Sequence, residues 1–186
     1  MVNSTTASEQ LSVSRFWDWS LALYPQIKPL CLAWQDDYGL NVNLMLLLLY
    51  LQQQQRPLTT RQLQQLIAAL APQQAFTQQL RQLRRQLPAH LAAADAARFK
   101  QQLLQAELCS EQLEQQCLIT TLSTCECSDE NADDHADKQP VAGASSASYS
   151  LLARYLDQLQ VPITSALQQQ LIDLDQTAAK VLLASY

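Results

Sequence analysis

Glycine is nearly absent from this chain, with two Gly among 186 residues. Phosphate-cradling loops and dinucleotide fingerprints need several glycines close together, so the sequence excludes most of them. β-Branched residues are also sparse, whereas Leu, Ala and Gln, which all suit helices, dominate. We therefore predict a single all-α domain without a sheet, in the form of a compact helical bundle with one disordered insertion.

Clustered positive charge is missing as well. The 12 Lys and Arg residues are outnumbered by 17 Asp and Glu, which gives a net charge of −5. A surface that binds nucleic acid needs a basic patch, so we expect no nucleic-acid partner.

Residues 1–14 lack the basic stretch followed by an apolar stretch that marks a secretory signal. We therefore expect a cytoplasmic protein with reduced thiols. The cysteines are odd in number and irregularly spaced, which agrees with this expectation: Cys31, Cys109, Cys117, Cys125 and Cys127.

One apolar run organises the chain. Residues 42–51 are apolar apart from Asn43, on every side of a helix rather than along one stripe. Such a helix must be surrounded by other helices. A bilayer span needs about 20 apolar residues, so we predict a buried central helix and no stable membrane insertion. Gly39 is expected to end the preceding helix, and Asn41 or Asn43 to cap this one.

Apolar spacing and prolines define the other helices. Pro25 and Pro72 are predicted to end helices, because a proline removes a backbone donor. The predicted helices around the central one span residues 15–24, 29–38, 60–70, 72–87, 91–119, 149–159 and 164 onward. The helix at 72–87 carries the apolar stripe Phe76, Leu80, Leu83 and Leu87. It is flanked by a basic trio that we predict to be a solvated face, with an acidic partner site as the alternative: Arg81, Arg84 and Arg85.

Residues 120–148 contain few apolar side chains, an acid-rich centre and a tail of small residues. They are predicted to form a disordered acidic linker. The resulting division is a flexible leader at 1–11, a helical core at 12–119, the linker, and C-terminal helices at 149–186 that pack on the core. Cys125, Cys127 and His135 in the linker match structural zinc sites poorly, because such sites space cysteines by two to four residues and need a fourth ligand. Regulatory metal binding or a thiol sensor remains the alternative.

Three carboxylates recur on one face of the long helix: Glu107, Glu111 and Glu114. Like charges at this spacing repel mildly. Either they are half-exposed, or Glu107 bonds Asn43 or an aromatic N–H in the core. The alternative is a carboxylate site completed by residues 36–37. Neither histidine follows a glutamate by three residues, as helical di-metal sites require. We therefore assign no metal ligand, no catalytic residue and no cofactor.

Four motifs stand out: FWxxSLxLY at 16–24, CLxxQDxxGxxVNL at 31–44, LRxLRR at 80–85 and AELxxExxEQ at 106–115. Together they resemble an uncharacterised bacterial family known only as a domain of unknown function, over about residues 14–119 and more loosely 149–180. The resemblance implies a compact helical cytosolic domain and supplies no activity. It also implies that Asp36, Asn43 and Glu107 belong to one interior polar cluster, for which Glu111 is a fourth candidate.

Leucine stripes are in excess and no catalytic constellation accompanies them. We therefore predict a non-enzymatic interaction or adaptor module, whose protein partner binds an apolar or glutamine-rich helical face. The alternative is a helical protein, enzymes included, that binds a small ligand or a metal at the interior cluster. That alternative predicts a cavity with inward-facing carboxylates, lined by Trp17, Trp34 and Tyr50.

Overall fold

The structure, a computed structural model, describes residues 11–88, 90–129 and 150–184. Within these ranges it contains six helices and no strand, which confirms the all-α prediction. The helices are α1 (Val13–Tyr38), α2 (Val42–Gln53), α3 (Thr60–Arg85), α4 (Ala93–Asp129), α5 (Leu151–Gln158) and α6 (Ser165–Ala184).

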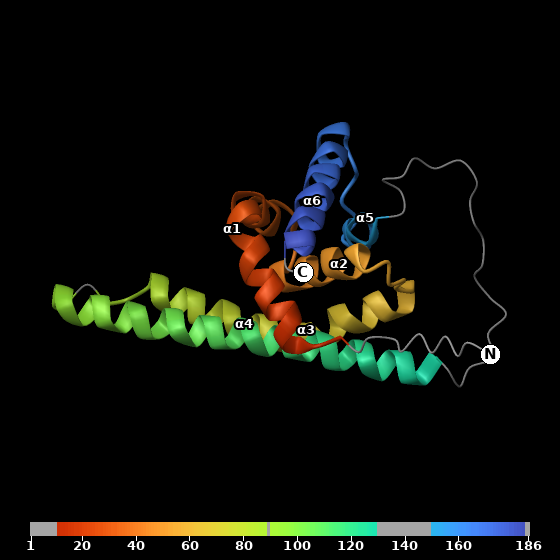
Figure 1. The fold of residues 1–186 in the computed structure, drawn as a ribbon. Coiled ribbons are helices and arrows are strands. Elements are labelled where there is room, and N and C mark those ends of the chain that lie inside the picture. The colour runs from red at the N-terminus through yellow and green to blue at the C-terminus, as the bar shows by residue number, and fades with distance from the viewer. Residues whose placement is uncertain (1–10, 89, 130–149, 185–186) are drawn as a thin grey trace, which may run out of the picture.

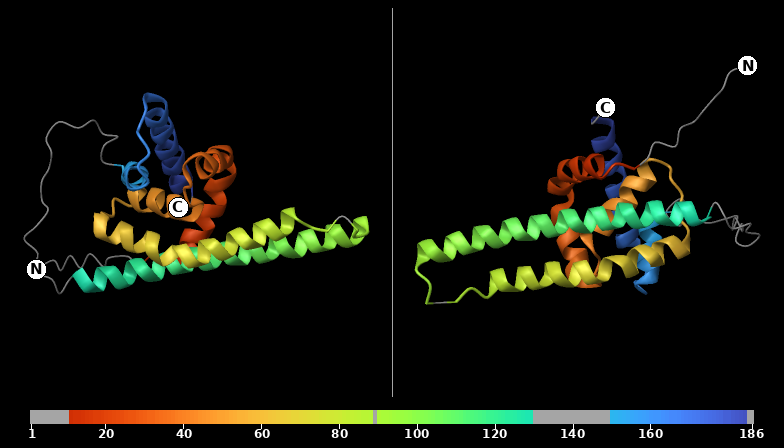
Figure 2. Two further views of the ribbon diagram at one scale, coloured as in Figure 1. Left: turned by 180° about the vertical axis from the view of Figure 1, so that it is seen from behind. Right: turned by 90° about the horizontal axis from the view of Figure 1, so that it is seen from below.

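Two layers of helices meet at α2. α3 and α4 form a long antiparallel hairpin on one side, while α1, α5 and α6 lie against α2 on the other (Figures 1 and 2). The closed end of the hairpin extends past α1 as a two-helix arm, which we define as residues 80–88 and 90–105. Among the described residues, no helix is both long and apolar enough to cross a bilayer.

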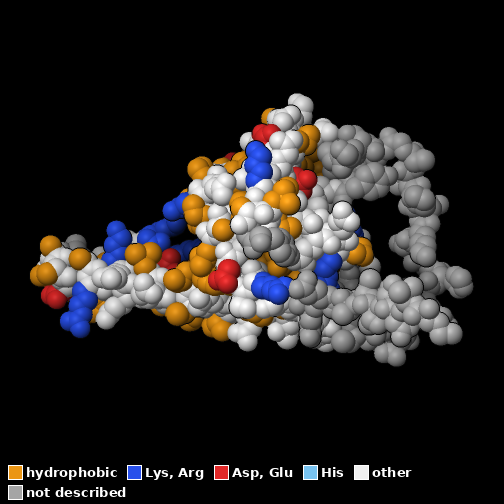
Figure 3. Space-filling model, viewed as in Figure 1, with side chains coloured by type: hydrophobic (Ala, Val, Ile, Leu, Met, Phe, Trp, Pro, Cys, Tyr) orange, Lys and Arg blue, Asp and Glu red, His pale blue; other side chains and the backbone are white. Residues whose placement is uncertain are grey.

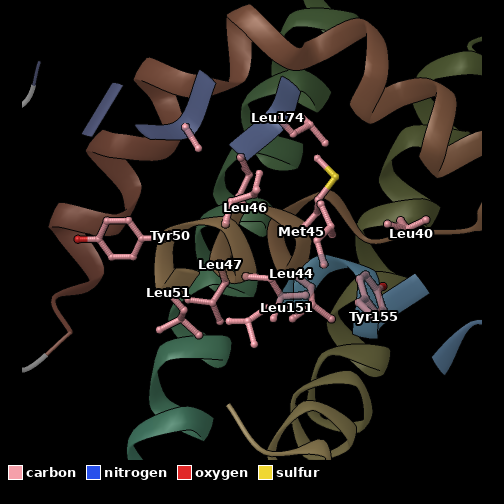
Figure 4. Packing of buried hydrophobic residues seen from close by; sticks show 14 of the residues in the cluster. Leu40, Leu44, Met45, Leu46, Leu47, Tyr50, Leu51, Leu151, Tyr155 and Leu174 are labelled. Carbon is pink, nitrogen blue, oxygen red and sulfur yellow. The ribbon is translucent and has the colours of Figure 1, made fainter. Parts of the chain in front are cut away.

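The central helix α2 is enclosed on all sides, as predicted. Residues 43–51 are all buried, and α2 contacts α1, α4, α5 and α6. Figure 4 shows Met45 directed toward Leu174 of α6, while Leu44 lies beside Leu151 of α5. Burying a side chain of this size stabilises the fold by about 1.5–3 kcal/mol. α2 therefore contributes a large part of the hydrophobic stabilisation.

The turn between α1 and α2 sets the position of the polar side chains described below. Gly39 has a φ of 71°, and its N–H donates to the Gln35 carbonyl at 3.1 Å. This left-handed conformation suits glycine, as predicted. Asn41 is the cap of α2, because its Oδ1 accepts from the Leu44 N–H at 2.9 Å. Asn43, the other capping candidate, lies inside the helix and is free to bond elsewhere.

The prediction that Pro25 and Pro72 end helices is wrong. α1 runs through Pro25 and Pro29, and α3 runs through Pro72. A proline inside a helix leaves the carbonyl four residues earlier without its bond. The prolines are exposed, and so are Leu21 and Ala68, two of the residues whose carbonyls lose that bond. Because these positions are exposed, water can replace the lost bonds, and α1 continues through its prolines as a bent helix (Figures 1 and 2).

The apolar stripe of residues 76–87 does not face the core. Phe76 is 50% exposed and Leu83 is 58% exposed, whereas Thr77 between them is buried. The reason is that α3 and α4 meet along this stretch through polar and charged side chains.

α4 is longer than predicted and reaches Asp129. The first ten residues of the predicted linker are therefore helical, with Leu122 and Cys125 buried. Cys125 lies in the helix, while His135 and the rest of the linker, like residues 1–10 of the leader, lie outside the described residues.

The C-terminal helices pack on α1 and α2. Leu152, Tyr155 and Leu156 of α5 are buried. The apolar positions of α6 recur at the helical period and are buried too: Leu167, Leu171, Leu174, Ala178 and Val181.

Candidate functional site

A hollow of about 200 Å³ lies between α1, α2, α3 and α4. Its apolar lining includes aromatic and aliphatic side chains: Trp17, Leu21, Tyr24, Val42, Leu46 and Leu108. Its polar lining comes from all four helices and from the α1–α2 turn, and includes Ser20, Asn43, Thr77, Arg81, Glu114 and Gln115.

Glu114 of α4 is the centre of the polar lining. Its carboxylate is buried, and Oε2 accepts from Asn43 Nδ2 at 2.8 Å and from Asn41 Nδ2 at 3.2 Å. Oε1 accepts from the Thr77 hydroxyl of α3. One carboxylate thus connects the α1–α2 turn, α2 and α3 to α4.

A chain of hydrogen bonds leads to Glu114 through the side chains of Gln73, Ser110 and Thr77. The single hydrogen of the Thr77 hydroxyl has two acceptors within reach, the Gln73 carbonyl at 3.1 Å and the Glu114 carboxylate. The carboxylate is the closer and stronger acceptor, so Thr77 donates to Glu114 and accepts at Ser110. Ser110 therefore donates to Thr77 across 2.7 Å and accepts from Gln73 Nε2 at 2.9 Å. Every hydrogen in this buried chain points toward the carboxylate, and such ordered chains strengthen each of their bonds.

Two buried polar atoms in the hollow have no hydrogen-bond partner. They are the Ser20 hydroxyl oxygen and Gln115 Oε1, on side chains that are 3% and 1% exposed. Gln115 uses its other end, because Nε2 donates to Asn43 Oδ1 at 3.0 Å. Buried polar groups in proteins nearly always have a partner, so two unsatisfied atoms in one hollow mark it as incomplete.

Three ion pairs lie beside the network, two close ones described next and a longer one of 4.0 Å between Arg81 Nε and Glu107 Oε2. Arg81 Nη2 contacts Glu111 Oε1 at 2.6 Å, and its Nη1 donates to Gln35 Oε1 at 3.3 Å. Arg84 holds Glu107 through two bonds, of 2.5 and 3.1 Å. The hydrogen bond to Glu107 raises the pKa of Arg84. Two residues of the basic trio therefore pair with α4 carboxylates instead of forming a solvated face, and Arg85 is exposed.

Tyr24 is close to these charges. Burial raises the pKa of its phenol, and the nearby Cys31 and Glu111 raise it further, while Arg81 lowers it. The phenol therefore keeps its proton at neutral pH and offers a hydroxyl to the hollow.

The structure brings three of the four predicted cluster residues near one another and leaves the fourth outside. Asn43 lies in the buried network, and Glu107 and Glu111 form the ion pairs beside it. Asp36 is exposed on α1. The carboxylate that binds Asn43 is Glu114, one heptad after Glu107.

The three predicted pocket residues do not line one pocket. Trp17 lines the hollow. Trp34 is in the core, where its Nε1 donates to Gln170 Oε1 at 3.0 Å. Tyr50 is in the core as well, with ring centroids 5.4 Å from Phe16 and 5.0 Å from Trp19.

Sequence reasoning missed Thr77, Ser20 and Gln115. Ser20 sits within an apolar stretch and Thr77 lies between Phe76 and two glutamines. Nothing local distinguishes a hydroxyl that faces a void from one that faces water. Gln115 gave a signal, since it follows Glu114 directly in the AELxxExxEQ motif. A Glu–Gln pair on the inner face of a helix indicates a polar interior.

No group of three or more His, Cys, Asp or Glu side chains in the described ranges is placed to hold a metal ion. The polar lining of the hollow is made chiefly of amides and hydroxyls, which bind organic groups through hydrogen bonds. Cys127 and His135 contribute nothing to this comparison, because the Cys127 side chain and the whole of His135 lie outside the described residues.

Comparison with known proteins identifies a family. No curated protein and no solved structure matches the chain. The family model described as a protein of unknown function, DUF2390, matches residues 15–118, a range that contains the four motifs and the polar residues of the hollow. The match confirms the resemblance, and because it covers more than half of the sequence, the chain belongs to the DUF2390 family.

Proposed function

We propose that the protein binds a small polar molecule in the hollow beside α2. The observation that carries this proposal is a pair of buried, unpartnered atoms, Ser20 Oγ and Gln115 Oε1, on two side chains that line the same hollow. A buried polar atom without a partner costs about 1–3 kcal/mol. A ligand that hydrogen-bonds both atoms recovers that free energy on binding.

The size of the hollow limits the ligand. Drug-sized ligands occupy pockets of about 300–1,000 Å³, and this hollow of about 200 Å³ is smaller. Its apolar wall, which includes Leu46 and Leu108, favours a ligand with an apolar part. We therefore expect a compact molecule with one polar end.

Tryptophan side chains offer a direct assay. Trp17 lines the hollow, whereas the Trp34 indole is bonded to Gln170 in the core. In ¹⁵N-labelled protein, each indole N–H gives one NMR signal, which Trp→Phe variants assign. Small neutral, anionic and cationic compounds are then titrated one at a time. A ligand of the hollow shifts the Trp17 signal saturably and leaves the Trp34 signal unchanged.

A matched pair of variants locates the binding. Leu108→Phe enlarges a side chain that lines the hollow, and Leu104→Phe makes the same change one turn earlier on α4, at an exposed position outside the lining. Binding is expected to weaken in Leu108→Phe and to persist in Leu104→Phe. If no compound shifts Trp17 in the unmodified protein, the proposal is wrong.

The arm supports a second candidate function, the binding of a protein partner. Leu83, Phe99 and Leu104 of the arm are 58%, 49% and 45% exposed. Hydrophobic and basic side chains gather on the arm in Figure 3, and its charged residues include Arg98 and Lys100. Exposed apolar side chains that lie together mark interaction sites. An amphipathic helix with acidic flanks fits such a surface.

Photo-crosslinking tests this second candidate. A benzoylphenylalanine placed at position 83 or 99 is expected to give one discrete adduct in expressing cells. The same group at Leu183, which is exposed on α6, serves as the control and is expected to give none. Equal, diffuse labelling from all three positions would remove the arm as a binding surface.

A further inference from the structure

The hydrogen-bond network determines which atoms of the hollow remain free. The Glu114 oxygens accept, so the atom of Asn43 that contacts them at 2.8 Å is its amide nitrogen. Asn43 Oδ1 is then the acceptor for Gln115 Nε2. The unpartnered atom of Gln115 must therefore be its oxygen, which only accepts. This orientation follows from the partners alone, without an arbitrary choice of amide flip.

The free hydrogen-bonding capacity of the hollow is thus mainly acceptor capacity. Gln115 Oε1 has two open lone pairs, and Glu114 receives three hydrogen bonds where a carboxylate offers about four positions. Ser20 can either donate or accept. A ligand that satisfies all three side chains must bring several donors on one small group.

The charges of the site also favour a ligand that donates hydrogen bonds. Of the three glutamates on this face of α4, Glu107 pairs with Arg84 and Glu111 pairs with Arg81. Glu114 is the most deeply buried of the three, and in the described structure its partners are all neutral. A buried charge normally has an opposite charge beside it. Arg81 also lines the hollow, but it is paired with Glu111, so Glu114 has no opposite charge among its hydrogen-bond partners in the described structure.

The residues that line the hollow suit an organic cation better than a metal ion. Ca²⁺ takes six to eight oxygen ligands and Mg²⁺ demands a near-ideal octahedron. The described residues provide no group of three His, Cys, Asp or Glu side chains for such an ion. Trp17 and Tyr24 instead offer aromatic rings, which attract organic cations. Leu46 and Val42 add an apolar wall for a hydrocarbon stem.

We propose that the hollow binds a small organic monocation, a primary ammonium on a short apolar stem, with its N–H groups donating to Gln115 Oε1, Ser20 Oγ and Glu114. The inference rests on the proposed function, because it names the ligand class of the same site. The ammonium supplies both the missing donors and the missing charge, and the stem lies against the aromatic and aliphatic wall.

Three compounds with the same four-carbon chain test the ligand class: n-butylammonium chloride, butan-1-ol and sodium butyrate. Each is titrated into ¹⁵N-labelled full-length protein at constant ionic strength, with the Trp17 indole signal as readout and that of Trp34 as internal control. Because hydrogen bonds to charged groups are stronger than neutral ones, n-butylammonium is expected to bind about tenfold or more tightly than butan-1-ol. Butyrate is expected to give no saturable shift.

Two variants separate charge from fold. Glu114→Gln keeps the shape of the side chain and removes its charge, so the preference for ammonium over alcohol should fall to about twofold or less. Ser20→Ala removes a hydroxyl that has no partner, so the fold is retained and ammonium binding is expected to weaken about threefold. Ser20→Ala therefore keeps the test valid if Glu114→Gln fails to fold.

The outcomes distinguish the ligand class from the site itself. If butan-1-ol and n-butylammonium bind equally and Ser20→Ala changes neither, the ammonium proposal is overturned while the hollow remains a binding site. If KCl reproduces the ammonium shift and competes with it, the site holds an inorganic ion and the organic cation is wrong. If no compound of any charge class shifts Trp17, both this inference and the proposed function fall.

Discussion

Asn43→Ala tests whether the buried network stabilises the fold. Asn43 is the polar residue inside α2 that bridges two residues of α4. Its Nδ2 donates to Glu114 at 2.8 Å, and its Oδ1 accepts from Gln115 Nε2 at 3.0 Å. Alanine keeps the helix and removes both bonds, so any loss of stability reports on the network rather than on α2 itself.

The magnitude follows from the two partners. The hydrogen bond to the Glu114 carboxylate contributes about 1.5–3 kcal/mol, as bonds to charged groups do. The Gln115 amide loses its acceptor in a buried place, which costs about 1–3 kcal/mol more. Water that enters through the hollow lowers this second cost. We therefore expect Asn43→Ala to lower the free energy of unfolding by about 3–5 kcal/mol, a large share of the about 5–15 kcal/mol of a typical domain.

Equilibrium unfolding in urea, followed by circular dichroism, measures this change. Gln101→Ala, at an exposed position of α4, is the control and should stay within about 0.5 kcal/mol of the unmodified protein. A double-mutant cycle with Gln115→Ala should show a coupling of about 1 kcal/mol or more, because each variant removes the partner of the other. A loss below about 1 kcal/mol for Asn43→Ala, with additive effects in the cycle, would refute the network as a stabilising element.

Three further predictions concern the core and the α1–α2 turn. Burial raises the pKa of the Cys31 thiol to about 12, so iodoacetamide at pH 8 should modify the exposed Cys109 and spare Cys31, as peptide mass spectrometry can show. Unfolded Cys31 loses its proton near pH 9, whereas folded Cys31 keeps it up to about pH 12. The stability that the protonated thiol contributes is therefore complete below pH 9 and is lost as the pH rises toward 12. Urea unfolding at alkaline pH should show a loss of up to about 1.4 kcal/mol per pH unit. Leu47→Ala opens a cavity at a position that is 0% exposed, and thermal and urea unfolding should show a loss of about 2–5 kcal/mol. Gly39→Ala introduces a Cβ that meets no atom within 4 Å but strains a φ of 71°, so its cost should be about 1–2 kcal/mol by urea unfolding, and a change below about 0.3 kcal/mol would contradict the strain argument.

The central helix could be predicted because its signal is local. Residues 42–51 are apolar in every direction, and no arrangement in water leaves such a helix exposed. The signal of Gly39 is equally local, because a residue without a side chain readily adopts the left-handed conformation that ends α1. The repeat of Leu167, Leu171 and Leu174 on α6 is equally local and correct.

The course of α1 and α3 could not be predicted from their prolines. Whether a proline ends a helix depends on whether the carbonyl that loses its bond faces water or protein, and that is decided by tertiary packing. Pro25 and Pro72 lie on exposed faces, so both helices continue. When the apolar stripe around a proline is interrupted, the sequence does not indicate whether that proline lies on the exposed or the buried face of the helix.

The predicted bond between Glu107 and Asn43 is wrong, because Asn43 binds Glu114 and Glu107 binds Arg84. The placement of Glu107, Glu111 and Glu114 on one face of a helix was visible as a spacing. Which of them meets Asn43 depends on how far α4 is shifted along α2, and a shift of one heptad presents an equivalent face. The partners of the α3 arginines likewise depend on how α4 is positioned. Arg81 and Arg84 reach Glu111 and Glu107, the two glutamates that Asn43 does not bind.

The faces of α4 support the proposed binding function of the hollow. In an ordinary amphipathic helix the apolar side chains turn inward. Along this stretch of α4, Ser110, Glu114 and Gln115 are buried, while Leu108 and Leu113 are 38% and 52% exposed. Replacing a buried polar cluster by apolar residues of similar volume is often neutral or stabilising, so stability alone does not explain such an arrangement. Local rules are expected to fail at functional sites. Here the inverted stretch of α4 coincides with the hollow and its unpartnered atoms, and the proposed binding of a ligand would account for both.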